Sequence, residues 1–310
     1  MVIPLTVIPV PGHGAEDVVV DAEGWVYTGT DDGSVFRVRP DGRRIDRVGG
    51  TGGRPLGLEL LPDGRLLVCD ARLGLLAMET RTGQVEVLTD LVEGRRMAFC
   101  NNAAVHSSGS IFFTDSSTRY GIDQWKADLV EDTRSGRLLR RDADGSVGLV
   151  LDGLRFANGV ALSGDESYVA VAETAGRTVV RRWLTGPRAG QVDRLAEDLP
   201  GYPDNIALGS DGLLWVTIAS PADPVVERLM RSPMPMRRIA WRVPAALQPR
   251  PKRTVRVVAL DHDGRTVKDL VADSSGFHMA TGVRENGGRV WLGSLEESAI
   301  AVLDSDHGAT

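Results

Sequence analysis

The chain has 310 residues, of which 36 are glycine, and carries a formal net charge of −6. Glycine without a three-residue period excludes collagen, and 42% apolar residues exclude a disordered chain. The acidic balance argues against a nucleic-acid partner. Two cysteines supply neither a disulfide framework nor a zinc motif. No signal peptide or membrane-spanning run is evident, so we expect a cytoplasmic protein with no membrane partner.

Short apolar runs with two-residue alternation predict β-strands along the whole chain. In chain order, the clearest runs cover residues 25–28, 65–68, 110–114, 168–171, 213–216 and 289–292. Asp-Gly pairs between apolar runs are typical of hairpin turns. Seven occur, ending at Gly33, Gly42, Gly64, Gly145, Gly153, Gly212 and Gly264.

The strands recur in a unit of roughly 40–50 residues. The turn residues before the strongest strand of each unit are Gly24, Gly64, Gly109, Glu166, Gly212 and Gly288. Six units predict an all-β fold, a six-bladed β-propeller whose four-stranded antiparallel blades surround a central channel. A β-sandwich or barrel is the alternative. We expect a single domain over residues 1–310.

Two long intervals between units predict insertions at about 117–136 and about 220–255. The second insertion contains three methionines, Trp241 and several prolines. It either forms an apolar lid over the channel mouth or packs against the rim of a blade.

Counting back eight residues from each turn residue reaches the entry to the innermost strand, where equivalent positions converge on the channel axis. This count gives Glu16, Leu56, Asn101, Asn158, Asp204 and Ala280. Four of these six residues carry oxygen-donor side chains, and four of the five asparagines in the chain lie at or beside this position. Asparagine is unfavourable inside strands and costly to bury without partners.

Glu16, Asn101, Asn158 and Asp204 are therefore candidate metal ligands. Hard oxygen donors suit Ca²⁺ best, with Mg²⁺ or Mn²⁺ possible, and four protein ligands leave calcium open positions for water or substrate. No histidine or cysteine falls on the count, which disfavours zinc. The alternative is that these polar side chains cap strands or close loops.

Six sequence motifs are distinctive: Phe156-Ala-Asn-Gly-Val-Ala-Leu-Ser, Val171-Ala-Glu-Thr, Arg182-Trp-Leu-Thr-Gly-Pro-Arg-Ala-Gly, Leu199-Pro-Gly-Tyr-Pro-Asp-Asn-Ile, Ile111-Phe-Phe-Thr-Asp-Ser-Ser and Trp291-Leu-Gly-Ser-Leu. With these motifs the chain resembles the strictosidine-synthase-like family over about residues 12–305. This family belongs with the gluconolactonase-like and paraoxonase-like six-bladed propellers. The resemblance implies an axial calcium held by a Glu, two Asn and an Asp, which match Glu16, Asn101, Asn158 and Asp204. It also implies hydrolysis of lactones, aryl esters or phosphotriesters.

One position departs from the family pattern. Thr281 stands where the plant synthase has its catalytic glutamate, so the resemblance favours the hydrolase branch over condensation chemistry. We therefore predict a calcium-dependent hydrolase. The alternatives are a non-hydrolytic biosynthetic enzyme of the strictosidine-synthase-like type and a non-enzymatic, metal-stabilised binding propeller.

The resemblance places a second role, as base or nucleophile, on Asp204. His13 and His278 lie close in sequence to the counted positions and are further candidates for a catalytic base, although a surface or packing role is the alternative for each. Asn102, Asn205 and Thr281 are expected to bind substrate, or in the case of the two asparagines to hydrogen-bond to the ligands. The expected partner is an apolar ester or lactone, with the protein a monomer or homodimer.

Overall fold

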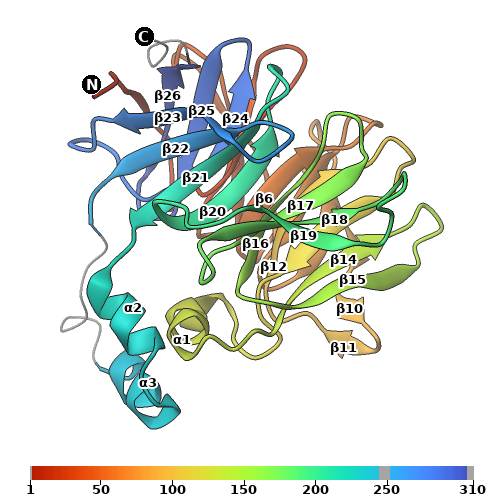
Figure 1. Cartoon of the computed structure of the whole chain (residues 1–310). Helices are drawn as coiled ribbons and strands as arrows, with labels where there is room; N and C mark the ends of the chain where they lie inside the picture. Colours follow the sequence, from red (N-terminus) through yellow and green to blue (C-terminus); the bar gives the residue numbers. More distant parts are fainter. Residues whose placement is uncertain (1, 244–251, 306–310) are drawn as a thin grey trace.

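Six four-stranded antiparallel sheets dominate the computed structural model, which describes residues 2–243 and 252–305. The sheets stand around a central channel as the blades of a β-propeller (Figure 1). The predicted all-β, six-bladed fold is therefore confirmed. A short extra hairpin pairs β10 (Leu91–Val92) with β11 (Arg95–Arg96).

Each blade runs from an inner strand at the channel to an outer strand at the rim. Blade one contains β2 (Val18–Val20), β3 (Val26–Gly29), β4 (Ser34–Val38) and β5 (Ile45–Gly50). Blade two contains β6 (Pro55–Leu60), β7 (Leu66–Asp70), β8 (Gly74–Met78) and β9 (Val85–Thr89). Blade three contains β12 (Cys100–Val105), β13 (Ile111–Asp115), β14 (Gly136–Arg141) and β15 (Val147–Leu154).

The second half of the chain repeats this order. Blade four contains β16 (Ala157–Leu162), β17 (Tyr168–Glu173), β18 (Thr178–Trp183) and β19 (Val192–Ala196). Blade five contains β20 (Gly201–Leu208), β21 (Leu214–Pro221), β22 (Val255–Leu260) and β23 (Thr266–Ala272). Blade six contains β24 (Ala280–Asn286), β25 (Arg289–Ser294) and β26 (Ala299–Asp304), and its fourth strand is β1 (Thr6–Pro9).

The start of the chain closes the ring by completing the last blade. β1 pairs antiparallel with β26, with Thr6 opposite Val302 and Pro9 opposite Ala299. This pairing covers the edge of the last blade, which would otherwise present unpaired backbone groups. Closure therefore depends on residues almost 300 positions apart in the sequence.

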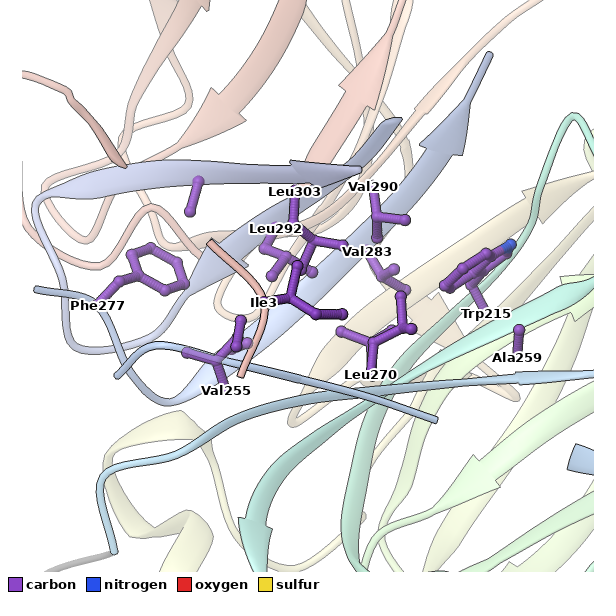
Figure 2. Close-up of a cluster of buried hydrophobic side chains, with 14 of the residues drawn as sticks. Ile3, Trp215, Val255, Ala259, Leu270, Phe277, Val283, Val290, Leu292 and Leu303 are labelled. Atoms are coloured by element: carbon purple, nitrogen blue, oxygen red, sulfur yellow. The ribbon is translucent and has the colours of Figure 1, made fainter. Parts of the chain in front are cut away.

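Apolar side chains fill the spaces between neighbouring blades, and one cluster lies at each of the six interfaces. Between blades five and six, Trp215 and Leu270 meet Val283 and Leu292 (Figure 2). The middle strands, such as β7 and β13, are buried at every residue and so supply apolar side chains to both faces of the sheet, because each blade packs against two others.

The predicted turns hold at six of the seven Asp-Gly pairs, whose glycines lie in turns between strands. All seven glycines have positive φ, for example 85° at Gly64, a conformation that costs other residues more than glycine. The exception is Gly153, which lies within β15 and not in a hairpin turn.

Helices occur within the two predicted insertions. The first forms η1 (Ile122–Gln124) and α1 (Trp125–Glu131), and the second forms α2 (Pro224–Met230) and α3 (Met234–Trp241). Asp223 caps α2 by accepting hydrogen bonds from the main-chain nitrogens of Val225 and Val226. The three α-helices lie together on one side of the blades (Figure 1). Residues 244–251 of the second insertion lie outside the described residues. None of the helices in the described ranges is long and apolar enough to cross a membrane.

Candidate metal centre and the cavities around it

The inner strands of blades two to six share a β-bulge at the same level of the channel. In blade three, Asn101 and Asn102 together stand opposite Thr114, which breaks the alternation of the strand. Asn158 and Asp204 occupy the first bulge position in blades four and five. In blade one, Glu16 lies just before β2 and its main-chain nitrogen donates to Gly29. A bulge explains how consecutive residues can both face the channel.

The two residues of each pair line different cavities. A cavity of about 40 Å³ has a lining that includes Glu16, Asn101, Asn158 and Asp204. The residues that follow three of them, Asp17, Asn102 and Asn205, line a separate cavity of about 440 Å³. The structure thus brings together the four predicted ligands, which we call the axial site. It places Asn102 and Asn205 in the other cavity, apart from Asp204.

Hydrogen bonds orient the two amides of the axial site. The Asn101 Nδ2 donates to Ser116 Oγ at 2.8 Å, and the Asn158 Nδ2 donates to Thr174 Oγ1 at 3.1 Å. Both amide nitrogens are thereby occupied. The Oδ1 atoms of Asn101 and Asn158 and the Oε2 of Glu16 are buried and have no hydrogen-bond partner. Three of the four residues therefore present an unsatisfied oxygen, which is costly in a protein interior.

The carboxylates of the axial site are held toward their neutral forms. Burial, followed by the nearby carboxylates of Asp204 and Asp17, raises the pKa of Glu16 well above its ordinary value, while the charge of Arg54 opposes the shift. Burial also raises the pKa of Asp204 to about 7, opposed by a hydrogen bond from Asn158. A cation bound between the two carboxylates would favour their charged forms and reverse both shifts.

These residues fit a divalent cation that prefers oxygen. Two carboxylates and two amide oxygens meet at one buried place, and a cation would satisfy the three oxygens that lack partners. No group of three or more His, Cys, Asp or Glu side chains suitable for a metal occurs in residues 2–243 and 252–305. The described residues that line the small cavity include two carboxylates and two amides but no histidine or cysteine, and such a donor set favours Ca²⁺, Mg²⁺ or Mn²⁺ over a softer ion such as zinc.

Thr281 occupies the first bulge position in blade six, equivalent to Asn101 and Asp204. The eight-residue count reached Ala280, one residue early, because blade six turns at Gly287 and Gly288 with a shorter loop. Thr281 lines the small cavity, and its Oγ1 donates at 2.8 Å to the carbonyl oxygen of Glu16. The hydroxyl proton of Thr281 is therefore used in a hydrogen bond to the backbone of blade one. The predicted contact between Thr281 and substrate stays a prediction.

The second bulge position carries a feature that sequence reasoning missed. Polar residues in blades one, three and five alternate there with glycines in blades two, four and six: Asp17, Gly57, Asn102, Gly159, Asn205 and Gly282. A Cβ atom on Gly159 would lie 2.5 Å from the Cα of Asn205. The glycines let neighbouring inner strands approach closely at the channel. A sequence pattern could have predicted this second ring of polar residues: three pairs of consecutive polar residues, Glu16-Asp17, Asn101-Asn102 and Asp204-Asn205.

Asp17 is a buried carboxylate that the sequence analysis did not single out, and it lies at the same height in the channel as Asn102 and Asn205. Its Oδ2 accepts hydrogen bonds from the main-chain nitrogen of Leu58 at 2.9 Å and from Asn102 Nδ2 at 3.4 Å. Burial raises its pKa to about 6, opposed by the Leu58 hydrogen bond and by the charge of Arg284. Asp17 therefore ties blade one to blades two and three beneath the axial site.

The two candidate histidines lie outside the lining of the axial cavity. His13 is exposed, and its Nδ1 lies 2.9 Å from Asp31 Oδ2. His278 is paired with Glu297 and lies 3.3 Å from an Arg253 nitrogen. Neither histidine lines a cavity that contains Asp204, so a catalytic role for them gains no support from the geometry.

An apolar cavity adjoins the axial site on the side of the helices. It measures about 210 Å³, and its lining includes Trp125, Leu129, Val226, Met230, Trp241 and Asp204. Asp204 lines this cavity as well as the smaller one and is only partly buried. Both insertions contribute to the lining, through α1 and through α2 and α3. Whether they act as a lid stays a prediction.

The helices are held over this cavity by polar contacts. Trp241 Nε1 of α3 donates to Glu131 Oε1 of α1 at 3.0 Å, and Arg238 lies 3.7 Å from the same oxygen. Arg237 donates to the Glu131 carbonyl oxygen at 3.1 Å. Glu131 is itself buried. One carboxylate thus fastens α3 to α1.

Comparisons with known proteins place the chain beside a defined family. A model of the strictosidine synthase family matches residues 101–187, and a model of the strictosidine synthase-like N-terminal region matches residues 5–38. Protein STRICTOSIDINE SYNTHASE-LIKE 13 of Arabidopsis thaliana is 36% identical over 81% of this chain, which spans 61% of that relative. Protein STRICTOSIDINE SYNTHASE-LIKE 6 of the same plant is 32% identical over 94% of this chain and 79% of the relative.

Solved structures share the fold at low identity. A gluconolactonase from Xanthomonas campestris superposes with a TM-score of 0.71 at 18% identity, covering 97% of this chain and 89% of that one. Regucalcin, a calcium-binding protein from Agrobacterium tumefaciens, superposes with a TM-score of 0.67 at 15% identity, covering 98% and 95%. At these identities the likeness establishes the propeller alone.

Proposed function

The chain belongs to the strictosidine synthase-like family, and from that premise we propose that it is a calcium-dependent hydrolase of lactones, aryl esters or related phosphotriesters. The reaction would occur at the axial site. The single observation that carries the proposal is the set of buried oxygens on Glu16, Asn101 and Asn158 that have no partner within the protein. The names of the fold neighbours, a gluconolactonase and a calcium-binding protein, agree with it.

Each residue of the axial site has a proposed task. Glu16, Asn101, Asn158 and Asp204 would hold Ca²⁺, or Mg²⁺ or Mn²⁺ in its place. When bound, such an ion supplies Lewis-acid polarisation of a carbonyl or phosphoryl oxygen. The hydrogen bonds from the amide nitrogens to Ser116 and Thr174 keep the amide oxygens turned toward the site. This fixed orientation avoids reorganisation during the reaction.

Asp204 is the residue we propose to act on the substrate. It lines both the axial cavity and the apolar cavity, so its carboxylate stands between a substrate and the other three ligands. Beside a cation it would be ionised, which weakens it as a base and suits it to act as a nucleophile or to orient a water.

The lining of the apolar cavity indicates the substrate class. Trp125, Leu129, Val226 and Met230 surround the space next to Asp204 and offer few hydrogen-bond donors. Polar side chains such as Tyr202 and Ser220 also line this cavity, but most of its surface is apolar, which favours burial of an apolar group over a hydroxyl-rich sugar lactone. We therefore propose an ester or lactone with an apolar acyl or aryl group.

Condensation chemistry of the plant synthase type is less compatible with this site. Thr281 stands where that chemistry requires a carboxylate, and its hydroxyl, which donates to the main-chain carbonyl of Glu16, cannot replace a carboxylate as general acid or base near neutral pH. A metal-stabilised propeller without catalytic activity is the remaining alternative, and the experiment below separates it from the hydrolase.

The test combines calcium binding with a hydrolysis panel. Metal-free protein is titrated with Ca²⁺ by calorimetry, and turnover of phenyl acetate, alkyl lactones of increasing chain length and gluconolactone is measured with and without chelator. We expect activity on the apolar substrates that is lost on chelation and restored by Ca²⁺. Asp204→Asn should lower kcat/KM by about 100-fold or more, in the range found when a preorganised catalytic group is removed.

Asn286→Ala is the matched control, because Asn286 is exposed at the end of β24, far along the strand from the bulge. It should retain calcium binding and turnover. Activity that survives complete removal of metal would contradict the proposal. Calcium that raises the melting temperature without any hydrolysis would establish the non-enzymatic alternative.

A further inference from the structure

The two helices of the second insertion carry an unusual set of exposed apolar side chains. We call residues 224–242 the α2–α3 hairpin. Within it, Val225 is 65% exposed, Met236 57% and Ile239 69%, and Met234 is also exposed. Other large apolar residues with comparable exposure, such as Val87 and Leu149, lie on separate strands of different blades. Scattered exposure of that kind is ordinary, whereas a cluster indicates an interaction surface.

Two of these apolar residues, Met236 and Ile239, lie on one side of α3, whereas Val225 belongs to α2 and lines the apolar cavity. Met234 lies seven residues before Trp241 and therefore shares the face of Trp241. Met236 and Ile239 are three residues apart and therefore share a face of the helix. Trp241, on a different face, points back to Glu131 and the apolar cavity. α3 forms the end of the helical cluster farthest from the sheets (Figure 1). The outward face of the hairpin is thus open, while its inward face is occupied.

The hairpin is also strongly basic. It contains five arginines and one glutamate, a formal charge of +4 in a chain whose net charge is −6. Four of the arginines are exposed: Arg228, Arg231, Arg238 and Arg242. Arg231 lies 3.9 Å from Glu227, a long and largely exposed contact that neutralises little of the positive field. Arg238 is partly neutralised by the buried Glu131, 3.7 Å away.

We propose that the outward face of the α2–α3 hairpin docks onto an anionic lipid surface. Surface-bound helices combine apolar side chains that enter the headgroup region with arginines that bind anionic headgroups, and this hairpin has both. The negative charge on the remainder of the chain orients the basic hairpin toward the lipid. A second copy of the chain is a poorer occupant, because two faces of +4 charge would repel each other. Docking of this kind requires no spanning segment, so it revises the expectation of no membrane partner.

The same helices connect the surface to the apolar cavity. Val226, Met230 and Trp241 line the cavity from the inner side of the hairpin, and Met236 and Ile239 face outward. If the proposed hydrolase function holds, docking would bring the cavity next to a lipid phase in which apolar esters dissolve. Lipid docking itself does not depend on that function, and its test measures binding without turnover.

The experiment is co-sedimentation of the full chain with vesicles. Vesicles of phosphatidylcholine alone are compared with vesicles that also contain phosphatidylglycerol, at low and high salt. We expect binding to the anionic vesicles, weakened at high salt by screening. The double variant Met236→Glu/Ile239→Glu and the double variant Arg231→Ser/Arg242→Ser should each reduce the bound fraction by about tenfold, since both the apolar and the charged contacts contribute.

Matched controls change equally exposed residues elsewhere. Val87→Glu/Leu149→Glu alters two outer strands, and Arg43→Ser removes an arginine of blade one that is 88% exposed. Circular dichroism and melting temperature confirm that every variant is folded. The controls should bind as the parent does.

Three outcomes would overturn the proposal. The first is absence of binding to anionic vesicles. The second is equal binding to neutral vesicles, or equal loss in controls and hairpin variants. The third is a dimer of the parent, measured by light scattering, that Met236→Glu/Ile239→Glu dissociates, because the face would then be an interface between copies of the chain.

Discussion

Thr281 Oγ1 donates a 2.8 Å hydrogen bond to the main-chain carbonyl oxygen of Glu16. This bond joins the inner strand of blade six to Glu16, the candidate ligand of blade one. It therefore contributes both to closure of the ring of blades and to the position of Glu16 in the axial site. Thr217 makes a similar bond to the carbonyl oxygen of Thr281 at 2.6 Å, and Thr114 bonds the carbonyl oxygen of Asn158 at 2.7 Å. Threonine hydroxyls thus connect neighbouring blades around the channel.

Replacing Thr281 by valine removes this bond and leaves a buried carbonyl oxygen without that partner. We expect the free energy of unfolding to fall by about 1–3 kcal/mol. Thr281→Ser retains the donor and should lose much less. Urea denaturation of the three proteins measures the difference, and equal stability of the valine and serine variants would rule out a role for the bond.

Asn101→Leu should separate the stability of the protein from its affinity for metal. The equivalent residue in blade two is already leucine, at Leu56, and Ser116 keeps its bond to the Ala157 carbonyl oxygen. Without metal, the variant loses an unsatisfied buried oxygen and should be at least as stable as the parent. Its calcium affinity should fall by about 10- to 100-fold, the range for disturbed metal sites.

Calorimetry and thermal melting in chelator provide the two readings for this variant. Unchanged calcium affinity would remove Asn101 from the ligand set. The Asn286→Ala variant serves again as the asparagine substitution that should alter neither reading.

Gly159→Ala should disrupt the inner strands, because a Cβ atom there would lie 2.2 Å from the main-chain nitrogen of Ile206. Overpacking against backbone cannot be relieved by a side-chain rotation, and we expect a loss of about 1–3 kcal/mol or more. Gly148→Ala in β15 is the control, since nothing lies within 4 Å of its added Cβ atom. The control should stay within about 1 kcal/mol of the parent in chemical denaturation.

The metal-free protein should become less stable as pH rises from about 4 to about 7. Burial raises the pKa of Asp204 from 3.8 to about 7 and that of Asp17 to about 6. In this range Asp204 and Asp17 hold more protons in the folded protein than in the unfolded chain, so through these two groups a rise in pH favours unfolding. Bound calcium should reverse this trend by stabilising the carboxylates. Urea midpoints across the pH series, with and without calcium, would reveal the opposite slopes.

Glu131→Ala should release α3 from α1. The substitution removes the acceptor of the Trp241 hydrogen bond and the partner of Arg238. A hydrogen bond to a charged group contributes about 1.5–3 kcal/mol, so trypsin cleavage within α3 should be roughly tenfold faster. Asp123→Ala, which removes an exposed carboxylate paired with Arg72, is the control. Unchanged cleavage would indicate that other contacts hold α3.

Spacing along the sequence was sufficient to predict the propeller and the convergence of Glu16, Asn101, Asn158 and Asp204 on one cavity, whereas their role as metal ligands stays a prediction. Each blade is formed by strands and turns that follow one another in the sequence. A turn glycine such as Gly64 or Gly212 therefore locates its blade without information from the other blades. The inner strands of a propeller converge by symmetry, and Glu16, Asn101, Asn158 and Asp204 therefore converge from counting alone.

Only the tertiary structure decided the features that depend on pairing between distant segments. The bulge sends Asn101 to one cavity and Asn102 to the other, and a count along the chain does not contain that difference. The register of blade six gives its axial position to Thr281, and β26 takes β1 as its partner across the whole chain. These outcomes are set by hydrogen bonds and close backbone contacts between blades. Sequence spacing determines which residues can meet, and long-range packing determines which of their atoms do.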